Sequence, residues 1–342
     1  MIFRLCIASI ALGAFLLADQ ASVIHAQETK PGAQVPVSIV KPRKLADGVM
    51  TVVPPEPHPD ETSLGPMDME FVSKHPELAW VAPDFPNNAP NFNAQSETLL
   101  ERAKGVTLRH SVYSLEFSFK PLRLVQVNVP NAAGEAEKKL VWYLLYKVRY
   151  VGDDLVPEVA PAQNGMQVPS PPTRKYFESV LFAPHFTVQS LSFDERTGKR
   201  FDRTYTEQIL PLAIPAIARI EKVGKPIYDS VEVCRRLPHS ADGSNNEFWG
   251  VATWANIDPS SDFLAVSIEG LTNAYKIEDD GGTKKFKKKV LQIHFWRPGD
   301  PIAAEQDSIL LGVPALEDTS RLEYILKQFG LPQRVDYTWT YR

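Results

Sequence analysis

The histidines are the side chains of this chain with the widest chemical range, and their spacing forms no motif. The seven histidines are His25, His58, His75, His110, His185, His239 and His294. No two of them stand two or four residues apart. Zinc sites usually combine histidine and cysteine ligands at such short spacings. We therefore predict no metal site and expect no cofactor.

The two cysteines are Cys6, in an N-terminal apolar segment, and Cys234, in the segment Ser230–Cys234. Residues 230–234 alternate as in a β-strand, so we predict a buried thiol with a structural role at Cys234. A nucleophilic cysteine needs a histidine and an oxyanion site beside it, and the sequence indicates neither. Loss of Cys6 with the leader described below would exclude an intramolecular disulfide.

The acidic residues cluster where turns are expected, at Asp153–Asp154, Asp242–Glu247 and Asp279–Asp280. Asp242–Glu247 lacks the spacing of an EF-hand, so a polar turn is favoured, with loose calcium binding as the alternative. The sequence contains no G-x-S-x-G, no phosphate-binding loop and no G-x-G-x-x-G. We predict no catalytic residue and a protein that is more an interaction protein than an enzyme.

The lysine-rich segment Lys284–Lys289 has the positive charge expected of a surface patch that binds anionic ligands. Glu278–Asp280 lies just before it and would partly neutralise its field. The favoured interpretation is one arm of a hairpin, whose lysines keep a sheet edge from pairing with another sheet. The formal net charge of −4 gives no bulk attraction to nucleic acid, and we expect no nucleic-acid partner.

Aromatic residues are the better candidates for a binding surface. Trp249, Trp254 and Trp296 all lie in expected strands, and aromatic faces on a flat sheet can stack on sugars or anchor protein partners. These three residues are the candidate ligand-binding residues. Trp249 and Trp254 are five positions apart, so an unbroken strand directs them to opposite faces. Packing in the core is the alternative for each.

Residues 1–26 predict a secretory signal peptide. Arg4 precedes the apolar run Leu5–Leu17, and Ala26 provides a small residue before the expected cleavage point. The apolar run is shorter than the ~20 residues that a membrane span needs. No later stretch is long and apolar enough to span, so we expect no transmembrane segment after cleavage. The predicted location is the periplasm, the cell surface or the extracellular space.

The remaining chain divides by composition and periodicity. Twelve prolines fall in residues 27–93, which predicts a partly disordered lead segment in which Val49–Val53 adds a short edge strand. A short helix is expected at 96–104. Pro215–Val223 is expected to be a second short helix that ends at Gly224, with an extended linker as the alternative. Two β units are then expected, at 94–213 and 226–342.

The second unit is expected to contain a hairpin formed by Phe248–Tyr275, with the turn Asp258–Asp262 between its arms. Near the C-terminus, Ser320–Glu323 has the form of a capping box that opens a helix. An alternating strand, Val335–Tyr341, follows the helix. About ten short strands and few helices predict a mainly β fold: two consecutive antiparallel immunoglobulin-like β-sandwiches, or one large sandwich.

These observations predict an exported, non-enzymatic protein that acts through protein–protein contacts, as an envelope or surface component. The motivation is the lack of a chemical motif together with the tether-like residues 27–93. The alternative is a carbohydrate-binding module with an aromatic platform and a polysaccharide partner. A hydrolase is a more distant alternative, because paired acids alone discriminate nothing.

Overall fold

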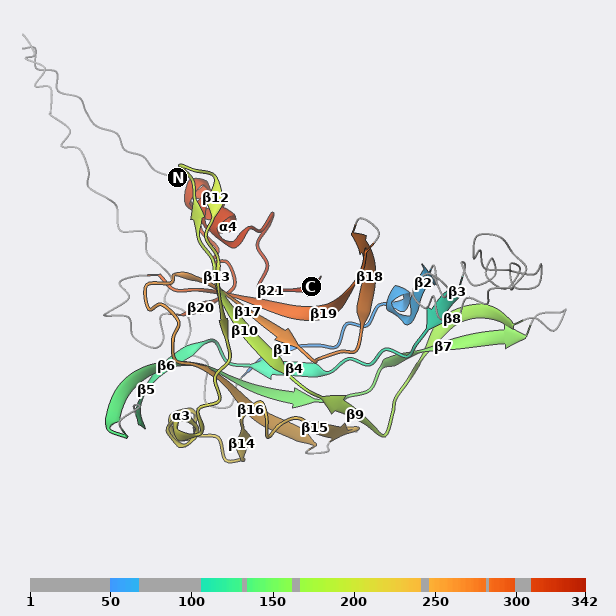
Figure 1. Ribbon diagram of the computed structural model, residues 1–342, viewed down its shortest axis with the longest axis horizontal. Coiled ribbons are helices and arrows are strands. Elements are labelled where there is room, and N and C mark those ends of the chain that lie inside the picture. The colour runs from blue at the N-terminus through green and yellow to red at the C-terminus, as the bar shows by residue number, and fades with distance from the viewer. Residues whose placement is uncertain are drawn as a thin grey trace, which may run out of the picture. The chain divides into compact units, whose positions relative to one another are not determined.

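The structure is a computed structural model that describes residues 50–67, 106–130, 134–161, 167–240, 246–280, 283–298 and 309–342. These residues are mainly β, arranged in several sheets (Figure 1). They belong to one compact unit, Pro42–Arg342. The predicted signal peptide, the helix at 96–104 and most of the lead segment lie outside the described residues.

A six-stranded sheet contains β1 (Thr51–Val53), β4 (Glu116–Phe119), β6 (Ala136–Arg149), β16 (Glu247–Trp254) and β14 (Ile227–Tyr228) in that order, with β5 (Arg123–Pro130) also paired to β6. All pairs are antiparallel except β14 with β16. β1 lies at the end of this order, as the sequence predicted for Val49–Val53. From Val141 on, β6 is buried on both faces, which its continuous apolar run allows.

A seven-stranded antiparallel sheet contains β13 (Arg203–Thr206), β10 (His185–Ser190), β17 (Phe263–Glu269), β19 (Thr283–Trp296) and β18 (Tyr275–Asp280). β20 (Leu310–Leu311) and β21 (Tyr337–Tyr341) also pair with β19. β17 and β18 pair with successive stretches of β19 and are separated by residues 270–274. Strands from both sides of the predicted boundary at 213–226 therefore share each large sheet; the boundary itself stays a prediction.

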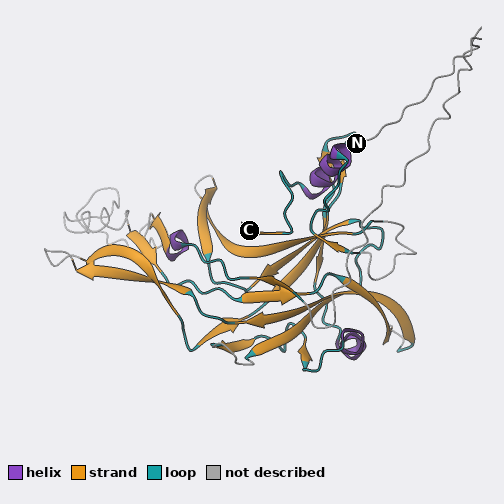
Figure 2. Ribbon diagram, turned by 180° about the vertical axis from the view of Figure 1, so that it is seen from behind, coloured by secondary structure: helices purple, strands orange, loops and turns teal. Residues whose placement is uncertain are grey.

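Four two-stranded sheets and four short helices complete the described elements. The small sheets are β2 (Ser63–Met67) with β3 (Val106–Arg109), β7 (Asp154–Pro161) with β8 (Gln167–Lys175), β9 (Ser179–Phe182) with β15 (Arg235–Pro238), and β11 (Phe193–Asp194) with β12 (Lys199–Arg200). The helices are η1 (Pro59–Thr62), η3 (Pro211–Ala213), α3 (Ile214–Glu221) and α4 (Thr319–Phe329). α3 and α4 lie on opposite sides of the strands (Figure 2).

Three clusters of buried apolar side chains explain this arrangement. The largest contains residues of both large sheets, among them Phe117, Tyr146 and Ile293. A second cluster packs α3 and η3 against the other face of the six-stranded sheet. A third packs α4 against the seven-stranded sheet through Ile325 and Phe329. Successive side chains of a strand point to opposite sides, so the central strands contribute apolar residues to the clusters on both faces of their sheet.

The predicted hairpin Phe248–Tyr275 is wrong. β16 lies in the six-stranded sheet and β17 in the seven-stranded sheet, so residues 255–262 cross between sheets. The two strands pair with β6 and β19 and not with each other. The strand propensity was read correctly, but a turn signal such as Asp258–Asp262 does not say whether the next strand pairs or crosses.

The predicted strand around Cys234 is also wrong. Asp229 Oδ1 accepts hydrogen bonds from the backbone N–H groups of Val231 and Glu232, at 2.9 and 2.8 Å, and the Val233 N–H donates to the Asp229 carbonyl. This side-chain cap closes a turn after β14. Cys234 follows the turn and is exposed, whereas a buried thiol was expected.

Residues 157–161 and 167–172, which are rich in proline, belong to the two-stranded β7–β8 sheet. Its prolines in these strands are Pro157, Pro161, Pro169, Pro171 and Pro172. The pairing register shifts between Val156 and Glu158, at the position of Pro157. Proline fits at a bulge or on an edge where no ladder hydrogen bond is needed, so a two-stranded ribbon can hold this many.

The two predicted helices that fall on described residues are present with shifted ends. α3 ends on Lys222, which adopts a left-handed conformation (φ 53°), and not at Gly224. α4 is capped by Asp318, whose carboxylate accepts from the Ser320 and Arg321 N–H groups, so Ser320 is inside the helix. Gly330 ends α4 in a left-handed conformation, which glycine adopts without strain.

Candidate functional site

A pocket of about 470 Å³ opens where β17 gives way to β18. Gly270, Thr272, Asn273 and Ala274 form its floor, and Gly270 makes the bend with φ 89°. A Cβ at this position would lie 2.2 Å from the Ala183 carbonyl oxygen, so only glycine allows this close approach. The pocket volume lies in the range of small-molecule sites, roughly 300–1,000 Å³.

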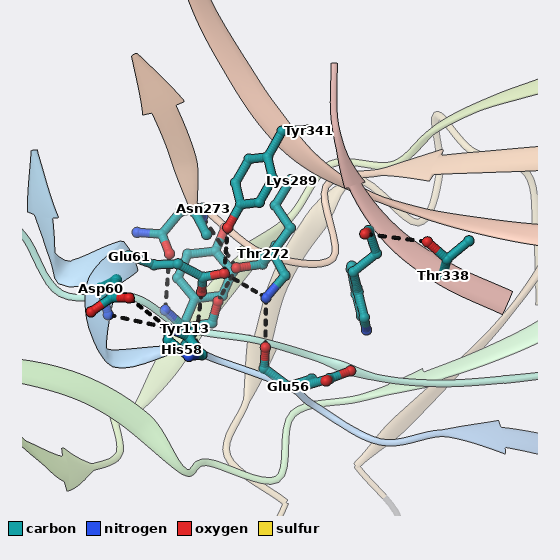
Figure 3. Close-up of polar contacts among 12 residues, drawn as sticks. Glu56, His58, Asp60, Glu61, Tyr113, Thr272, Asn273, Lys289, Thr338 and Tyr341 are labelled. Carbon is teal, nitrogen blue, oxygen red and sulfur yellow. Dashed lines mark hydrogen bonds and ion pairs between the residues drawn. The ribbon is translucent and has the colours of Figure 1, made fainter. Parts of the chain in front are cut away.

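Side chains of the bend fix the pocket floor to the segment before β4. Thr272 Oγ1 donates to the Tyr113 carbonyl at 2.6 Å, and Asn273 Oδ1 accepts from the Tyr113 N–H at 2.9 Å (Figure 3). Asn273 Nδ2 also donates to the Ser111 carbonyl at 2.8 Å. Both polar atoms of the Asn273 amide are used, so the floor is held in one conformation.

One residue that lines the pocket, Lys289, belongs to a buried ion pair. Lys289 Nζ donates to Glu61 Oε1 and to the Glu56 carbonyl, each at 2.6 Å (Figure 3). The Tyr341 hydroxyl donates to the same Glu61 oxygen at 2.5 Å, and the His58 N–H donates to the other oxygen. Burial and the neighbouring carboxylate raise the pKa of Tyr341. We name Glu61, Lys289 and Tyr341 the Glu61 cluster; it ties η1 to β19 and β21.

Charged groups at the pocket mouth surround one carboxylate. Glu269 accepts from Lys288 Nζ at 3.2 Å, and the His185 ring lies 4.0 Å from its other oxygen. The positive charge of Lys288 is therefore balanced locally. These side chains are partly exposed and offer both donors and acceptors to a ligand.

One wall of the pocket is aromatic. The Tyr275 ring stacks on His110 with centroids 5.1 Å apart and lies 5.9 Å from the ring of Phe286. Phe286 is 62 % exposed. Folding gains little from an aromatic ring left this open, so the position is suited to contact with a ligand.

The lysine run that includes Phe286 forms the hairpin arm predicted from sequence. Lys285 and Lys287 pair with Asp280 and Glu278 across the β18–β19 hairpin. Their charges are thus neutralised within the hairpin, which favours the edge-protecting interpretation over an anion patch.

A second surface feature lies on β9 and the residues before it. Tyr176 is 67 % and Leu181 49 % exposed, and Phe177 lies between them in sequence. The Tyr176 ring stacks on His239 at 4.4 Å, and Leu181 is paired in register with Arg236 of β15. We name Tyr176, Phe177, Leu181 and Arg236 the β9 patch. It combines exposed apolar groups with tyrosine and arginine, the composition of protein contact sites.

A partly buried acid lies away from both surfaces. Ser230 Oγ donates to Glu207 Oε1 at 2.5 Å. Burial raises the pKa of Glu207 to about 7, and the nearby carboxylate of Asp229 adds to the rise. Glu207 therefore changes its charge near neutral pH.

The three candidate tryptophans are dispersed. Trp254 and Trp296 are only 1 % and 4 % exposed, in the first and third apolar clusters. Trp249 packs against the second cluster, and its Nε1 donates to Glu247 at 3.2 Å. Trp249 and Trp254 do point to opposite faces of β16, but the structure brings no two of the three together. Their role in ligand binding stays a prediction.

Sequence reasoning missed both the pocket and the β9 patch. Phe286 stands between lysines on an exposed strand, which is the one local signal that could have identified it. Glu269, His185 and Lys288 come from three strands and meet only through the sheet register. Within the described ranges, no three histidine, cysteine or acidic side chains are grouped to hold a metal ion.

Comparison of the chain with protein-family models, curated proteins and solved structures finds no match in any of the three. The helices within the described residues are all too short or too polar to cross a membrane.

Proposed function

We propose that this chain is an exported, non-enzymatic protein that acts by binding another protein. The β9 patch is the observation that carries this proposal. Leu181 leaves apolar surface in water on the side of β9 that faces away from the main core, and Tyr176 and Phe177, just before β9, are exposed as well. Val180 and Phe182 fill the opposite side. A folded chain loses nothing by placing polar residues at the outer positions, so their apolar character supports a contact role.

The proposal also covers the fold, as one large β-sandwich, and the location outside the cytoplasm. The shared apolar cluster supports one large antiparallel β-sandwich, of the two arrangements expected from sequence. Export rests on the composition of residues 1–26.

The fixed backbone of the β9 patch also supports a preformed contact site. The Tyr113 hydroxyl donates to the Leu181 carbonyl at 2.9 Å, and the His239 N–H donates to the Glu178 carbonyl at 2.9 Å. A surface held this way loses little conformational entropy on binding. Tyrosine and arginine at its edge are the residue types that dominate binding energy in protein interfaces.

Site-specific crosslinking tests the proposal. The full chain would carry a photoreactive amino acid at position 176 and be irradiated in the cells that produce it. We expect one discrete crosslinked species, identified by mass spectrometry as a different protein, which disappears when Leu181→Asp is added. The matched control places the photoreactive group at Phe201, which is 57 % exposed on another element.

Three results would contradict a protein partner at the β9 patch. They are no crosslink at position 176, a crosslink that survives Leu181→Asp, and a crosslink to a second copy of this chain alone.

The alternative of a carbohydrate-binding module on a tryptophan platform gains no support from Trp254 and Trp296, because both side chains are buried. Other residues, on the seven-stranded sheet, favour a sugar ligand.

A further inference from the structure

We propose that the outer face of the seven-stranded sheet, from a polar row on β10, β13, β17, β19 and β21 to the pocket beside Phe286, binds a neutral oligosaccharide. This site is separate from the β9 patch and shares no residue with it.

Five polar side chains stand in one register row across five strands. The row consists of Thr206, Thr187, Ser267, Gln292 and Thr338, each paired with the next. Their sequence neighbours on each strand, such as Val188, Ile268 and Leu291, belong to the main apolar cluster. The row therefore faces away from the core. Since neighbouring strands lie about 4.8 Å apart, the row spans about 19 Å.

The side chains of the row are less exposed than those on an ordinary solvent-facing sheet surface. Ser267 is only 4 % exposed, and Thr187, Gln292 and Thr338 are half-buried. The Arg342 guanidinium lies over the row and donates to Ser267 Oγ at 2.9 Å and to Gln189 Oε1 at 3.1 Å. Burial lowers the pKa of Arg342, so water is partly excluded there.

α4 and the pocket flank the row on its two sides, in the direction of β17. Two residues before Ser267, Ala265 is covered by α4 as part of the third apolar cluster. Two residues after Ser267, Glu269 enters the pocket. On β19, Lys288 and Phe286 continue with the same parity as Gln292 and so extend the same face. A ligand on the row reaches the pocket without crossing a strand.

The chemistry of these groups matches a polyhydroxylated ring. Hydroxyl, amide and carboxylate groups supply paired donors and acceptors for sugar hydroxyls. The exposed ring of Phe286, next to Tyr275, offers an apolar face on which the C–H side of a sugar can stack. An acidic polymer is disfavoured, because Glu269 balances Lys288 and the acids of β18 balance Lys285 and Lys287.

Calorimetric titration of the full chain tests the site. The probes are the hexasaccharides of β-1,4-linked glucose, xylose, mannose and N-acetylglucosamine, with an oligogalacturonate as the acidic comparison. We expect at least one neutral probe to bind, and Phe286→Ser to weaken it about tenfold. Gln292→Leu and Thr338→Val remove row hydrogen bonds at similar volume, and each should weaken binding several-fold.

Two variants serve as matched controls. Phe201→Ser removes an equally exposed phenylalanine from another hairpin, and Thr51→Val changes a half-buried threonine on β1. Both should bind as the parent does, and circular dichroism should show all five variants folded.

The inference is overturned if none of the four neutral probes binds, or if Phe286→Ser and Gln292→Leu leave the affinity unchanged. Binding of the oligogalacturonate alone, lost in 0.5 M salt, would also overturn it, since that result indicates simple charge attraction. Leu181→Asp should not change sugar binding, so failure of this site and failure of the protein contact are separable.

Discussion

Two buried glutamates join a helix to a sheet in this protein, and they differ in how their charge is balanced. Glu221, at the end of α3, accepts from Lys120 at 2.7 Å, Arg123 at 3.0 Å and the Tyr143 hydroxyl at 2.7 Å. Glu61 also has one lysine and one tyrosine partner, Lys289 and Tyr341, but it lacks a second cation. In place of the arginine, a backbone N–H from His58 completes the shell.

The difference concerns what remains when the carboxylate is lost. Without Glu221, Lys120 and Arg123 would face each other inside the protein with no anion between them. Without Glu61, Lys289 would keep the Glu56 carbonyl and the ring of Trp339, which lies 5.2 Å away. A buried carboxylate is therefore more important for stability where it separates two cations than where it neutralises one.

The largest expected effect is that of Glu221→Gln. Two buried cations would lose their counter-charge, and the free energy of unfolding should fall by about 3–5 kcal/mol. Urea denaturation followed by tryptophan fluorescence measures the change. Glu195→Gln, at an exposed ion pair with Lys327, is the control and should cost less than about 1 kcal/mol.

Glu61→Gln should destabilise less, by about 1–3 kcal/mol, because Lys289 retains a carbonyl partner. The same denaturation measurement compares it with Glu221→Gln. Equal losses in the two variants would break the comparison and show that the second cation near Glu221 adds nothing.

A third carboxylate, Glu207, sharpens the comparison, because its partner is the Ser230 hydroxyl and the nearby charge is the anionic Asp229. Its pKa of about 7 in the folded protein lies above the ordinary value of 4.5. The folded state then holds more protons than the unfolded state between pH 4.5 and 7, so stability falls as the pH rises through this window. At pH 8, Glu207→Gln should be more stable than the parent by about 1–3 kcal/mol.

The stabilisation by Glu207→Gln should vanish near pH 4, where the Glu207 side chain of the parent is protonated and therefore as uncharged as the glutamine of the variant. His294 acts in the opposite sense: burial lowers its pKa to about 4, so its contribution is lost as the pH falls below 6.5. The difference between variant and parent at each pH isolates Glu207. A variant that is less stable than the parent at pH 8 would falsify the reading of a buried, uncompensated acid.

The smallest effect is expected from the tyrosines. Tyr143→Phe and Tyr341→Phe each remove one hydrogen bond to a buried carboxylate, which should cost about 1–2 kcal/mol. Loss of Tyr341 should cost more, because Glu221 keeps two cations and Glu61 keeps one. The pair of denaturation curves, recorded together, checks this order, and the reverse order would contradict it.

The sequence predicted individual strands well and their partners poorly. Period-two alternation over Val335–Tyr341 identified β21, because its aromatic residues alternate with polar ones as in a half-buried strand. It could not reveal that β16 and β17 belong to different sheets, since strand pairing depends on distant segments. It also mistook Ser230–Cys234 for a strand, where the Asp229 carboxylate closes a turn.

The candidate sites were beyond sequence reasoning for a related reason. The polar row draws one residue from each of five strands, which are far apart in the sequence. Glu221 meets Lys120 across 101 positions of chain. Such groupings arise from register and packing, which short-range patterns do not encode.

The pairing of β19 has a consequence for biosynthesis. It is the partner of β17 and β18 before it and of β20 and β21 after it. A growing chain cannot complete the seven-stranded sheet until β21 has been synthesised. The part of the main apolar cluster that Tyr337 and Trp339 pack against must stay uncovered until then. The availability of β21, and not the emergence of an N-terminal half, therefore sets when this sheet can reach its folded state.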